Sequence, residues 1–176
     1  MTTHTPSPTQ SGTGHLWRAH LMASQGLLDI VQRELQQHVN MLLIHYEILD
    51  RLIEVPEHSL RMSELADSAQ SSRSRLSHAI ARLEEIGYVE RRECPIDRRG
   101  SFAVLTEAGE QAYRSARPHV ERSLEHHLYD VLDDTEQQQL LSLYAKLLSH
   151  LAGTDVLPGA CTRGLTGAAQ QDMSQS

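Results

Sequence analysis

Cysteine and lysine are scarce in this chain of 176 residues, which contains two cysteines and a single lysine, Lys146. The cysteines, Cys94 and Cys161, form no C-x-x-C pair, so the sequence indicates neither a disulfide framework nor a cysteine-ligated zinc site. A chain with so little cysteine suits a reducing compartment, and we expect a cytoplasmic protein.

Long hydrophobic runs are also missing from the chain. No apolar stretch approaches the length of about 20 residues that spans a bilayer, and the N-terminal stretch MTTHTPSPTQSGTG lacks the hydrophobic centre of a signal peptide. The sequence contains no G-x-S-x-G elbow, H-E-x-x-H pair, P-loop or dinucleotide-binding fingerprint. We therefore expect a soluble protein with no membrane partner, no cofactor and no enzymatic activity.

Positive charge is concentrated in one segment of an acidic chain. The formal net charge is -7, but residues 71–101 contain seven arginines against five acidic residues, an excess of +2 that leaves -9 for the rest. Such an asymmetry predicts that this segment meets an anionic partner, whereas the remainder keeps the protein in solution.

Long amphipathic helices are expected on both sides of this segment. Apolar spacing predicts helices over 15–38, 107–130 and 134–152. The second of these should be interrupted by a kink near Pro118, and Asp134 with Gln137 resembles a capping box at the start of the third. Residues 1–14 and 153–176 lack periodic apolar positions, so we expect two disordered tails around one domain, residues 15–152.

Shorter elements are predicted between the long helices. Asn40 is expected to cap a helix that ends before Pro56, Ser63 starts a short helix, and another helix over about 72–86 ends at Gly87, where a left-handed cap belongs. Two strands, YVERREC and SFAVLT, flank the turn PIDRRG. Two short helices joined by a polar turn and followed by a hairpin predict a mainly α (α+β) winged helix-turn-helix.

The helix over residues 72–86 has two different faces. Its apolar residues are expected to pack inward: Leu76, Ala79, Ile80, Leu83 and Ile86. The opposite stripe consists of Arg75, His78 and Arg82. Hydroxyls and arginines near a helix N-terminus suit a phosphate, and arginine can bind guanine in a major groove. An ordinary solvated polar face is the alternative interpretation of this stripe.

Two further arginines, Arg98 and Arg99, lie at the tip of the hairpin next to Asp97. Arginines on a rigid loop can enter a minor groove, where the negative field attracts guanidinium groups. A charged surface turn with a weak ion pair is the alternative. Because the helix and the hairpin are adjacent and both rich in arginine, together they favour a winged helix-turn-helix.

The stretch from Leu60 to Gly109 resembles the winged-helix core of the multiple-antibiotic-resistance regulator (MarR) family. The pattern D-R-R-x-x-x-x-x-L-T-x-x-G, from Asp97 to Gly109, is similar to the wing of that family. The resemblance implies a winged helix-turn-helix over about 40–106 and dimerisation helices over about 15–38 and 107–152.

The resemblance also implies a function. Members are homodimeric transcription factors, usually repressors, that bind double-stranded DNA at a near-palindromic operator and often leave it when a small lipophilic or aromatic ligand binds. The implied recognition-helix contacts are Ser72, Arg73, Arg75, Ser77, His78 and Arg82. The implied wing contacts are Arg98 and Arg99, with Asp97 as their orienting partner. Candidates for the effector pocket are Trp17, His20, His45, Tyr46 and Tyr113, each of which would serve equally well as core or interface packing.

Other functions remain open as alternatives. Zinc-sensing relatives use two histidines one turn apart in the fifth helix, but His119 is followed at i+4 by Ser123, and the adjacent His126 and His127 point about 100° apart, so we expect no metal site. Peroxide-sensing relatives carry their cysteine in the first helix, where this chain has none, although oxidation of Cys94 would disturb the wing. A helical interaction module that binds no DNA would leave the wing unexplained.

Overall fold

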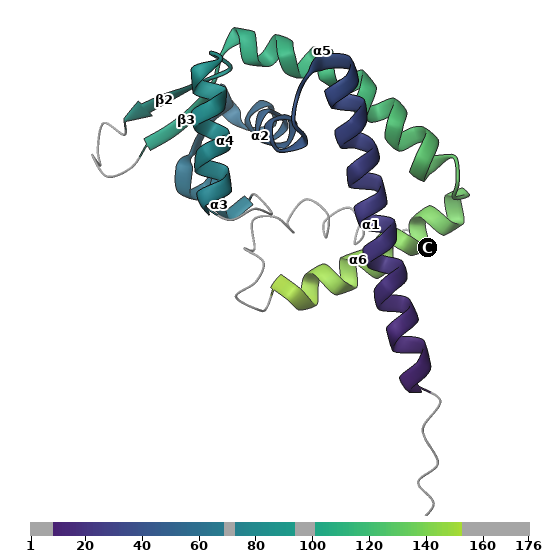
Figure 1. The fold of residues 1–176 in the computed structure, drawn as a ribbon. Helices are drawn as coiled ribbons and strands as arrows, with labels where there is room; N and C mark the ends of the chain where they lie inside the picture. Colours follow the sequence, from purple (N-terminus) through teal and green to yellow (C-terminus); the bar gives the residue numbers. More distant parts are fainter. Residues whose placement is uncertain (1–8, 69–72, 94–100, 153–176) are drawn as a thin grey trace, which may run out of the picture.

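Long helices make up most of the fold, and a small sheet lies at one side of it (Figure 1). The computed structural model describes residues 9–68, 73–93 and 101–152. Within these ranges the helices are α1 (Thr9–Val39), α2 (Leu43–Ile53), α3 (Met62–Ser68), α4 (Arg73–Glu85), α5 (Glu107–Leu124) and α6 (Asp134–Ala152). The strands are β1 (Ser59–Arg61), β2 (Val89–Glu93) and β3 (Ser101–Leu105), and two short helical turns are η1 (Pro56–His58) and η2 (Glu125–Tyr129). This mainly α architecture confirms the predicted fold class.

The sheet is antiparallel and has the strand order β1-β3-β2. Strands β2 and β3 form the predicted hairpin, with Val89 opposite Leu105. Strand β1 adds to the free edge of β3, with Arg61 opposite Phe102. The sequence did not indicate β1, because a strand of three residues is too short to show an alternating pattern.

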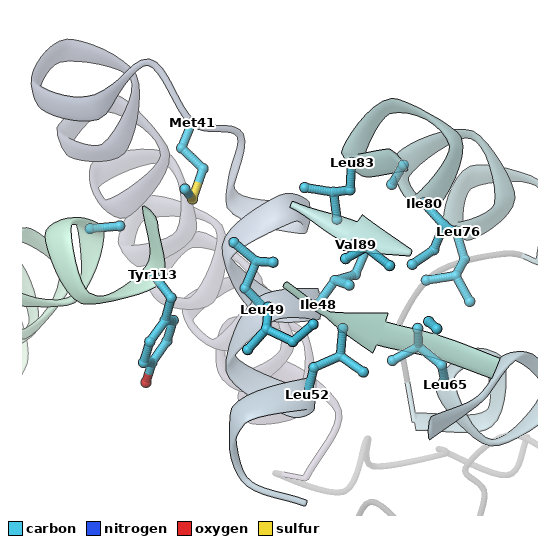
Figure 2. Packing of buried hydrophobic residues seen from close by; sticks show 14 of the residues in the cluster. Met41, Ile48, Leu49, Leu52, Leu65, Leu76, Ile80, Leu83, Val89 and Tyr113 are labelled. Carbon is cyan, nitrogen blue, oxygen red and sulfur yellow. The ribbon is translucent and has the colours of Figure 1, made fainter. Parts of the chain in front are cut away.

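The hydrophobic core lies where α2, α3 and α4 meet the sheet. Leu52, Leu65 and Leu83, one from each of these helices, have exposed fractions of 0–1%, and Val89 of β2 is also buried. Figure 2 shows side chains from these elements converging on one cluster. Burying a large aliphatic side chain stabilises a fold by about 1.5–3 kcal/mol, so this cluster holds α4 firmly against the sheet.

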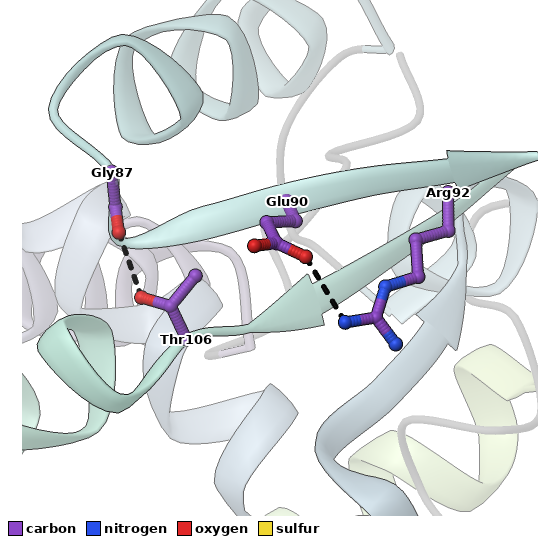
Figure 3. Close-up of polar contacts among 4 residues, drawn as sticks. All are labelled: Gly87, Glu90, Arg92 and Thr106. Carbon is purple, nitrogen blue, oxygen red and sulfur yellow. Dashed lines mark hydrogen bonds and ion pairs between the residues drawn. The ribbon is translucent and has the colours of Figure 1, made fainter.

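Thr106 connects the hairpin to α5. Its hydroxyl accepts a hydrogen bond from the amide of Gly109 at 3.0 Å, which caps α5, and donates one to the carbonyl oxygen of Gly87 at 2.7 Å (Figure 3). Gly87 has a φ of 77° and ends the turn after α4, as predicted. One hydroxyl thus ties the end of α4 to the start of α5.

Apolar side chains on α1 and α6 remain uncovered. Leu16, Trp17 and Met22 of α1 are 73%, 61% and 75% exposed, and Leu143 and Leu147 of α6 are 57% and 54% exposed. These five residues are called the α1–α6 surface below. The two helices approach each other, because the hydroxyl of Tyr144 lies 3.3 Å from Nδ1 of His20. Exposed apolar residues gathered on two neighbouring helices mark an interaction surface.

The predicted limits of α1 and α2 need correction. Helix α1 begins at Thr9, earlier than expected. Asn40 does not cap α2: its positive φ of 50° follows the end of α1, a conformation that asparagine tolerates better than most residues. The amide of Leu43 at the start of α2 donates instead to the side chain of Gln32, at 2.9 Å.

The predicted details of α5 and α6 also differ from the structure. Helix α5 continues through Pro118 without interruption, because Ala116 and Val120 on either side are buried in the core and hold both turns in place. The capping box of α6 is formed by Asp133 and Glu136. The side chain of Asp133 accepts a hydrogen bond from the amide of Glu136 at 2.9 Å, and the side chain of Glu136 accepts one from the amide of Asp133 at 3.0 Å. It therefore lies one residue before the pair expected from the sequence.

Within the described ranges, none of the helices combines the length and the apolar character that a membrane span needs.

Candidate nucleic-acid interface

Helix α4 buries one face and exposes the other. Leu76, Ala79, Ile80 and Leu83 have exposed fractions between 0% and 6%. Arg75, Ser77, His78 and Arg82 are all exposed. Ile86 departs from the prediction: it is 40% exposed, because α4 ends at Glu85 and the chain then turns away. The basic stripe predicted from the sequence therefore faces outward from a well-anchored helix.

Arg82 forms an ion pair with Glu85 on the surface of α4. Both side chains are more than half exposed, at 57% and 67%. Exposed ion pairs of this kind contribute about 0–1 kcal/mol. Arg82 can therefore exchange the carboxylate for a phosphate group at little cost.

Several predicted site residues lie outside the described residues. These are Ser72 before α4, and Cys94, Asp97, Arg98 and Arg99 between β2 and β3. Arg73 is placed as the first residue of α4.

The sheet carries two arginines that were not predicted as DNA contacts. Arg61 on β1 and Arg92 on β2 both lie opposite Phe102 of the central strand. The guanidinium carbon of Arg61 lies 5.3 Å from the centre of the Phe102 ring, and Arg92 donates a hydrogen bond to Glu90 at 3.0 Å (Figure 3). Paired residues of antiparallel strands share one face, so both arginines extend along the outer face of the wing sheet.

An ion pair links α4 to the sheet. Arg91 of β2 lies 2.9 Å from the carboxylate of Glu84, and both side chains are partly exposed. The pair joins the helix that carries the basic stripe to the strand that leads into the wing. It therefore helps to fix the relative positions of the two elements that were predicted to contact DNA.

A cavity of about 730 Å³ lies between α4 and the segment that joins α1 to α2. Helix α4 contributes Arg75, His78 and Arg82 to its lining, and the opposite wall includes Met41 and His45. Burial and the nearby charge of Arg82 lower the pKa of His45, so this ring is neutral at pH 7. The cavity thus combines guanidinium groups with apolar walls, which suits an anion that has a hydrophobic body.

The five residues predicted for the effector pocket lie in three different places. Only His45 lines the cavity beside α4. Tyr46 and Tyr113 line a separate cavity of about 590 Å³ between α2 and α5, where their rings stack with centroids 5.4 Å apart. Trp17 and His20 lie next to each other on α1 and line neither cavity. The structure therefore does not bring these five side chains together.

One group of side chains in the described residues could hold a metal ion. Glu34 and His38 of α1 and His119 of α5 place one ligand atom each within 4.8 Å of the others. This group lies on α1 and α5 and includes no residue of α4.

Comparison with known proteins assigns this architecture to a family. The model of the MarR family matches residues 39–100. Sco3205, a MarR family transcriptional regulator from Streptomyces coelicolor crystallised in complex with DNA, is 37% identical, and the alignment covers 82% of this chain and 94% of that one with a TM-score of 0.77. AbsC, a MarR family transcriptional regulator from the same organism, is 36% identical over 86% of this chain and 100% of that one, with a TM-score of 0.75.

A third relative is the transcriptional repressor MprA of Escherichia coli strain K12, which is 39% identical over 94 residues. That alignment covers 53% of each chain, so the match spans about half the length of this curated relative.

Proposed function

The chain belongs to the MarR family, and we propose that it is a transcriptional repressor that binds DNA in a sequence-specific manner as a homodimer. The observation that carries the proposal is the exposed stripe of Arg75, His78 and Arg82 on α4, in a chain whose net charge is -7. The likeness to Sco3205, which was crystallised with DNA, supports DNA binding, and the likeness to MprA supports repression. The proposal makes the protein a regulator and not an enzyme, and places it in the cytoplasm with its DNA.

The two basic elements would have different tasks on DNA. Arg75 and His78 project from a helix narrow enough to enter a major groove, where arginine forms two hydrogen bonds to guanine. Arg98 and Arg99 in the wing would bind phosphates or the minor groove, and Arg61 and Arg92 on the outer face of the wing sheet would add to that electrostatic attraction. The sequence preference would therefore come from α4, and much of the affinity from the wing.

The homodimer would form through the α1–α6 surface. A single copy leaves Trp17, Leu143 and Leu147 more than half exposed, and covering apolar area stabilises an association by about 25 cal/mol per Å². A two-fold axis through this surface would present two α4 helices to DNA. Two α4 helices separated by one turn of DNA, about 34 Å, would match the two half-sites of a near-palindromic operator.

A small effector would bind in the cavity beside α4. Arg75, His78 and Arg82 line that cavity and also form the exposed stripe. An aromatic or lipophilic anion that bound the guanidinium groups of Arg75 and Arg82 would compete with DNA for them. The cavity thus offers a direct physical route from ligand binding to release of the operator.

Selection of bound fragments from the genome that encodes the protein tests DNA binding. A gel-shift titration then compares the selected operator with a scrambled duplex of equal composition at several salt concentrations. We expect the operator to bind at least about 1,000-fold more tightly than the scrambled duplex, with an affinity that falls as salt rises. Equal affinity for both duplexes at every salt concentration contradicts the proposal.

Release by an effector is tested on the same complex with a panel of aromatic carboxylic acids. His45→Leu removes a polar group from the cavity without altering the α4 stripe, and His20→Leu on α1 serves as its control. We expect an active acid to release wild type and His20→Leu, and His45→Leu to require a higher concentration. An acid that releases all three proteins at the same concentration would place the effector elsewhere.

A further inference from the structure

We propose that Glu34, His38 and His119 form a binding site for a divalent transition-metal ion such as Zn²⁺, and that the bound ion fastens α1 to α5. The three residues place one ligand atom each within 4.8 Å of the others. Two come from α1 and the third from α5, which packs along α1. The inference departs from the sequence-based expectation that the chain holds no metal.

The two residues of α1 already have a separation that suits a metal ion. Glu34 and His38 stand four positions apart and therefore share one face of the helix. Nε2 of His38 lies 3.4 Å from a carboxylate oxygen of Glu34. Two ligands of a tetrahedral zinc ion, each bound at about 2.0–2.1 Å, lie about 3.3 Å apart. This pair can therefore accept the ion with very little movement.

His119 supplies the third ligand from the neighbouring helix. Its ring stacks on that of His38, with centroids 4.5 Å apart and an angle of 10° between the planes. The side chain of His38 is 46% exposed, so its ring has room to rotate until a nitrogen of each imidazole faces a common point. The helix pair thus holds two imidazoles at a distance that one ion can bridge.

A buried nitrogen on His119 supports a ligand at this position. Nδ1 of His119 is buried and has no hydrogen-bond partner among the described residues. Buried polar atoms are nearly always satisfied, so a nitrogen of this kind requires an explanation. Coordination of the His119 ring to a cation would compensate for the desolvation of the imidazole.

A surface ion pair is the simpler interpretation of Glu34 and His38, and it does not account for His119. Exposed pairs of this type contribute little to stability, and they need no third residue. Two imidazoles and one carboxylate instead form a ligand set that Zn²⁺ prefers, whereas Mg²⁺ and Ca²⁺ prefer oxygen ligands alone. Three protein ligands leave a fourth position for water.

The position of the site suggests what the ion would do. Helix α1 carries part of the α1–α6 surface, and α5 continues directly from the wing strand β3 through Thr106. An ion held by both helices would oppose their separation and stabilise the folded chain by mass action. This inference concerns metal binding alone, so it does not depend on the proposed DNA binding.

Zinc binding is measured on the full chain by competition with a chromogenic chelator, after metal has been removed with EDTA. We expect one Zn²⁺ per chain in the wild type. Glu34→Gln, His38→Gln and His119→Gln should each weaken binding more than about 100-fold, because even the outer partners of metal ligands change affinity by about 10- to 100-fold.

The double variant His126→Gln/His127→Gln is the matched control. It removes two exposed imidazoles whose centroids are 4.7 Å apart and which belong to no three-residue ligand group among the described residues. We expect this variant to bind zinc like the wild type. If the control and His38→Gln lost zinc affinity to the same extent, the histidines would bind zinc nonspecifically, and the proposal would be overturned.

Two further measurements separate coordination from misfolding. Zn²⁺ should raise the melting temperature of the wild type and leave that of His38→Gln unchanged, although both proteins melt alike in EDTA. Co²⁺ should give the visible absorption of a four-coordinate site in the wild type and lose it in His38→Gln. Because His38 is exposed, its replacement leaves the fold intact, and an unchanged Co²⁺ spectrum in that variant would refute the site.

Discussion

A Cβ atom at position 109 would lie 2.1 Å from the carbonyl oxygen of Tyr88, because Gly109 in the first turn of α5 crosses directly over the start of β2. The same carbonyl accepts a hydrogen bond from the amide of Thr106 at 3.1 Å. The backbone of Tyr88 is thus hydrogen-bonded to Thr106 and packed closely against Gly109. Packing therefore requires a glycine at position 109, the end of the L-T-x-x-G pattern.

Replacing Gly109 with alanine should destabilise the protein. The new methyl group would meet the backbone oxygen of Tyr88 as well as the side chain of Leu105, and overpacking of this kind costs about 1–3 kcal/mol. Urea denaturation at a fixed protein concentration measures the change in the free energy of unfolding. Gly26→Ala is the control, since nothing lies within 4 Å of its added Cβ and alanine favours a helix by about 1 kcal/mol over glycine. A stable Gly109→Ala protein would show that α5 can shift away from the sheet.

The hydroxyl of Thr106 should contribute to stability through its two hydrogen bonds. Thr106→Val keeps the shape of the side chain but loses the bonds to Gly109 and Gly87, and loss of such a cap costs about 0.5–2 kcal/mol. Thr106→Ser keeps the hydroxyl and should stay within a few tenths of a kcal/mol of the wild type. The same denaturation series distinguishes the two variants. A Thr106→Val protein as stable as the wild type and Thr106→Ser would show that the two hydrogen bonds contribute nothing.

Tyr113 should make the stability of the protein sensitive to alkaline pH. Its hydroxyl donates to a carboxylate oxygen of Asp50 at 2.7 Å, and burial, together with this bond, raises the pKa of Tyr113. The unfolded chain loses the phenol proton near the ordinary tyrosine pKa of 10.0. The stabilisation is therefore complete below about pH 10 and declines as the pH rises further.

Tyr113→Phe tests this pH dependence. At neutral pH the variant should lose about 1–3 kcal/mol, since it leaves Asp50 without its donor. Above about pH 10 the difference from the wild type should narrow. A gap of constant size from about pH 7 to about pH 11 would contradict the role of the Tyr113 proton.

The α4 helix shows how much the sequence could predict. Leu76, Ile80 and Leu83 recur at helical spacing, and local periodicity was enough to assign both the buried face and the basic stripe. Gly87 was also predicted correctly, because a left-handed cap depends on a few neighbouring residues. Local signals therefore predicted the elements of the candidate DNA interface.

Contacts between segments that are far apart in the sequence could not be predicted from such local patterns. The pairing of β1 with β3 places Arg61 beside Phe102, but three residues carry no periodic signal. Ser123, at i+4 from His119, gave no indication of a metal site, whereas Glu34 and His38, which are grouped with His119 in the structure, come from α1. Asn40 shows a third limit, because a residue that favours caps also favours the left-handed conformation that it adopts here. Tertiary packing decides each of these cases.

The α1–α6 surface should be the dimer interface. Leu147→Glu places a charge on an apolar residue that is 54% exposed in the single chain, and burying that carboxylate between two copies would be strongly unfavourable. Light scattering after size exclusion should show a dimer for the wild type and a monomer for the variant. Gln138→Glu adds the same charge on the opposite side of α6 and should remain dimeric. A dimeric Leu147→Glu protein would move the interface to another surface.

DNA binding should respond differently to the loss of α4 and wing arginines. Arg75→Ala removes a guanidinium group from the exposed stripe, so we expect weaker operator binding and a changed base preference in the half-site, of about 1–3 kcal/mol at the affected position. Arg98→Ala should weaken binding to operator and scrambled DNA alike and should reduce the salt slope by about 1, since it removes one phosphate contact. Arg122→Ala, an exposed arginine near the far end of α5, is the control and should change neither affinity nor slope. If Arg75→Ala lowers the affinity for the operator and for scrambled DNA by the same factor, Arg75 does not recognise bases, and the proposed division between base recognition by α4 and phosphate binding by the wing is rejected.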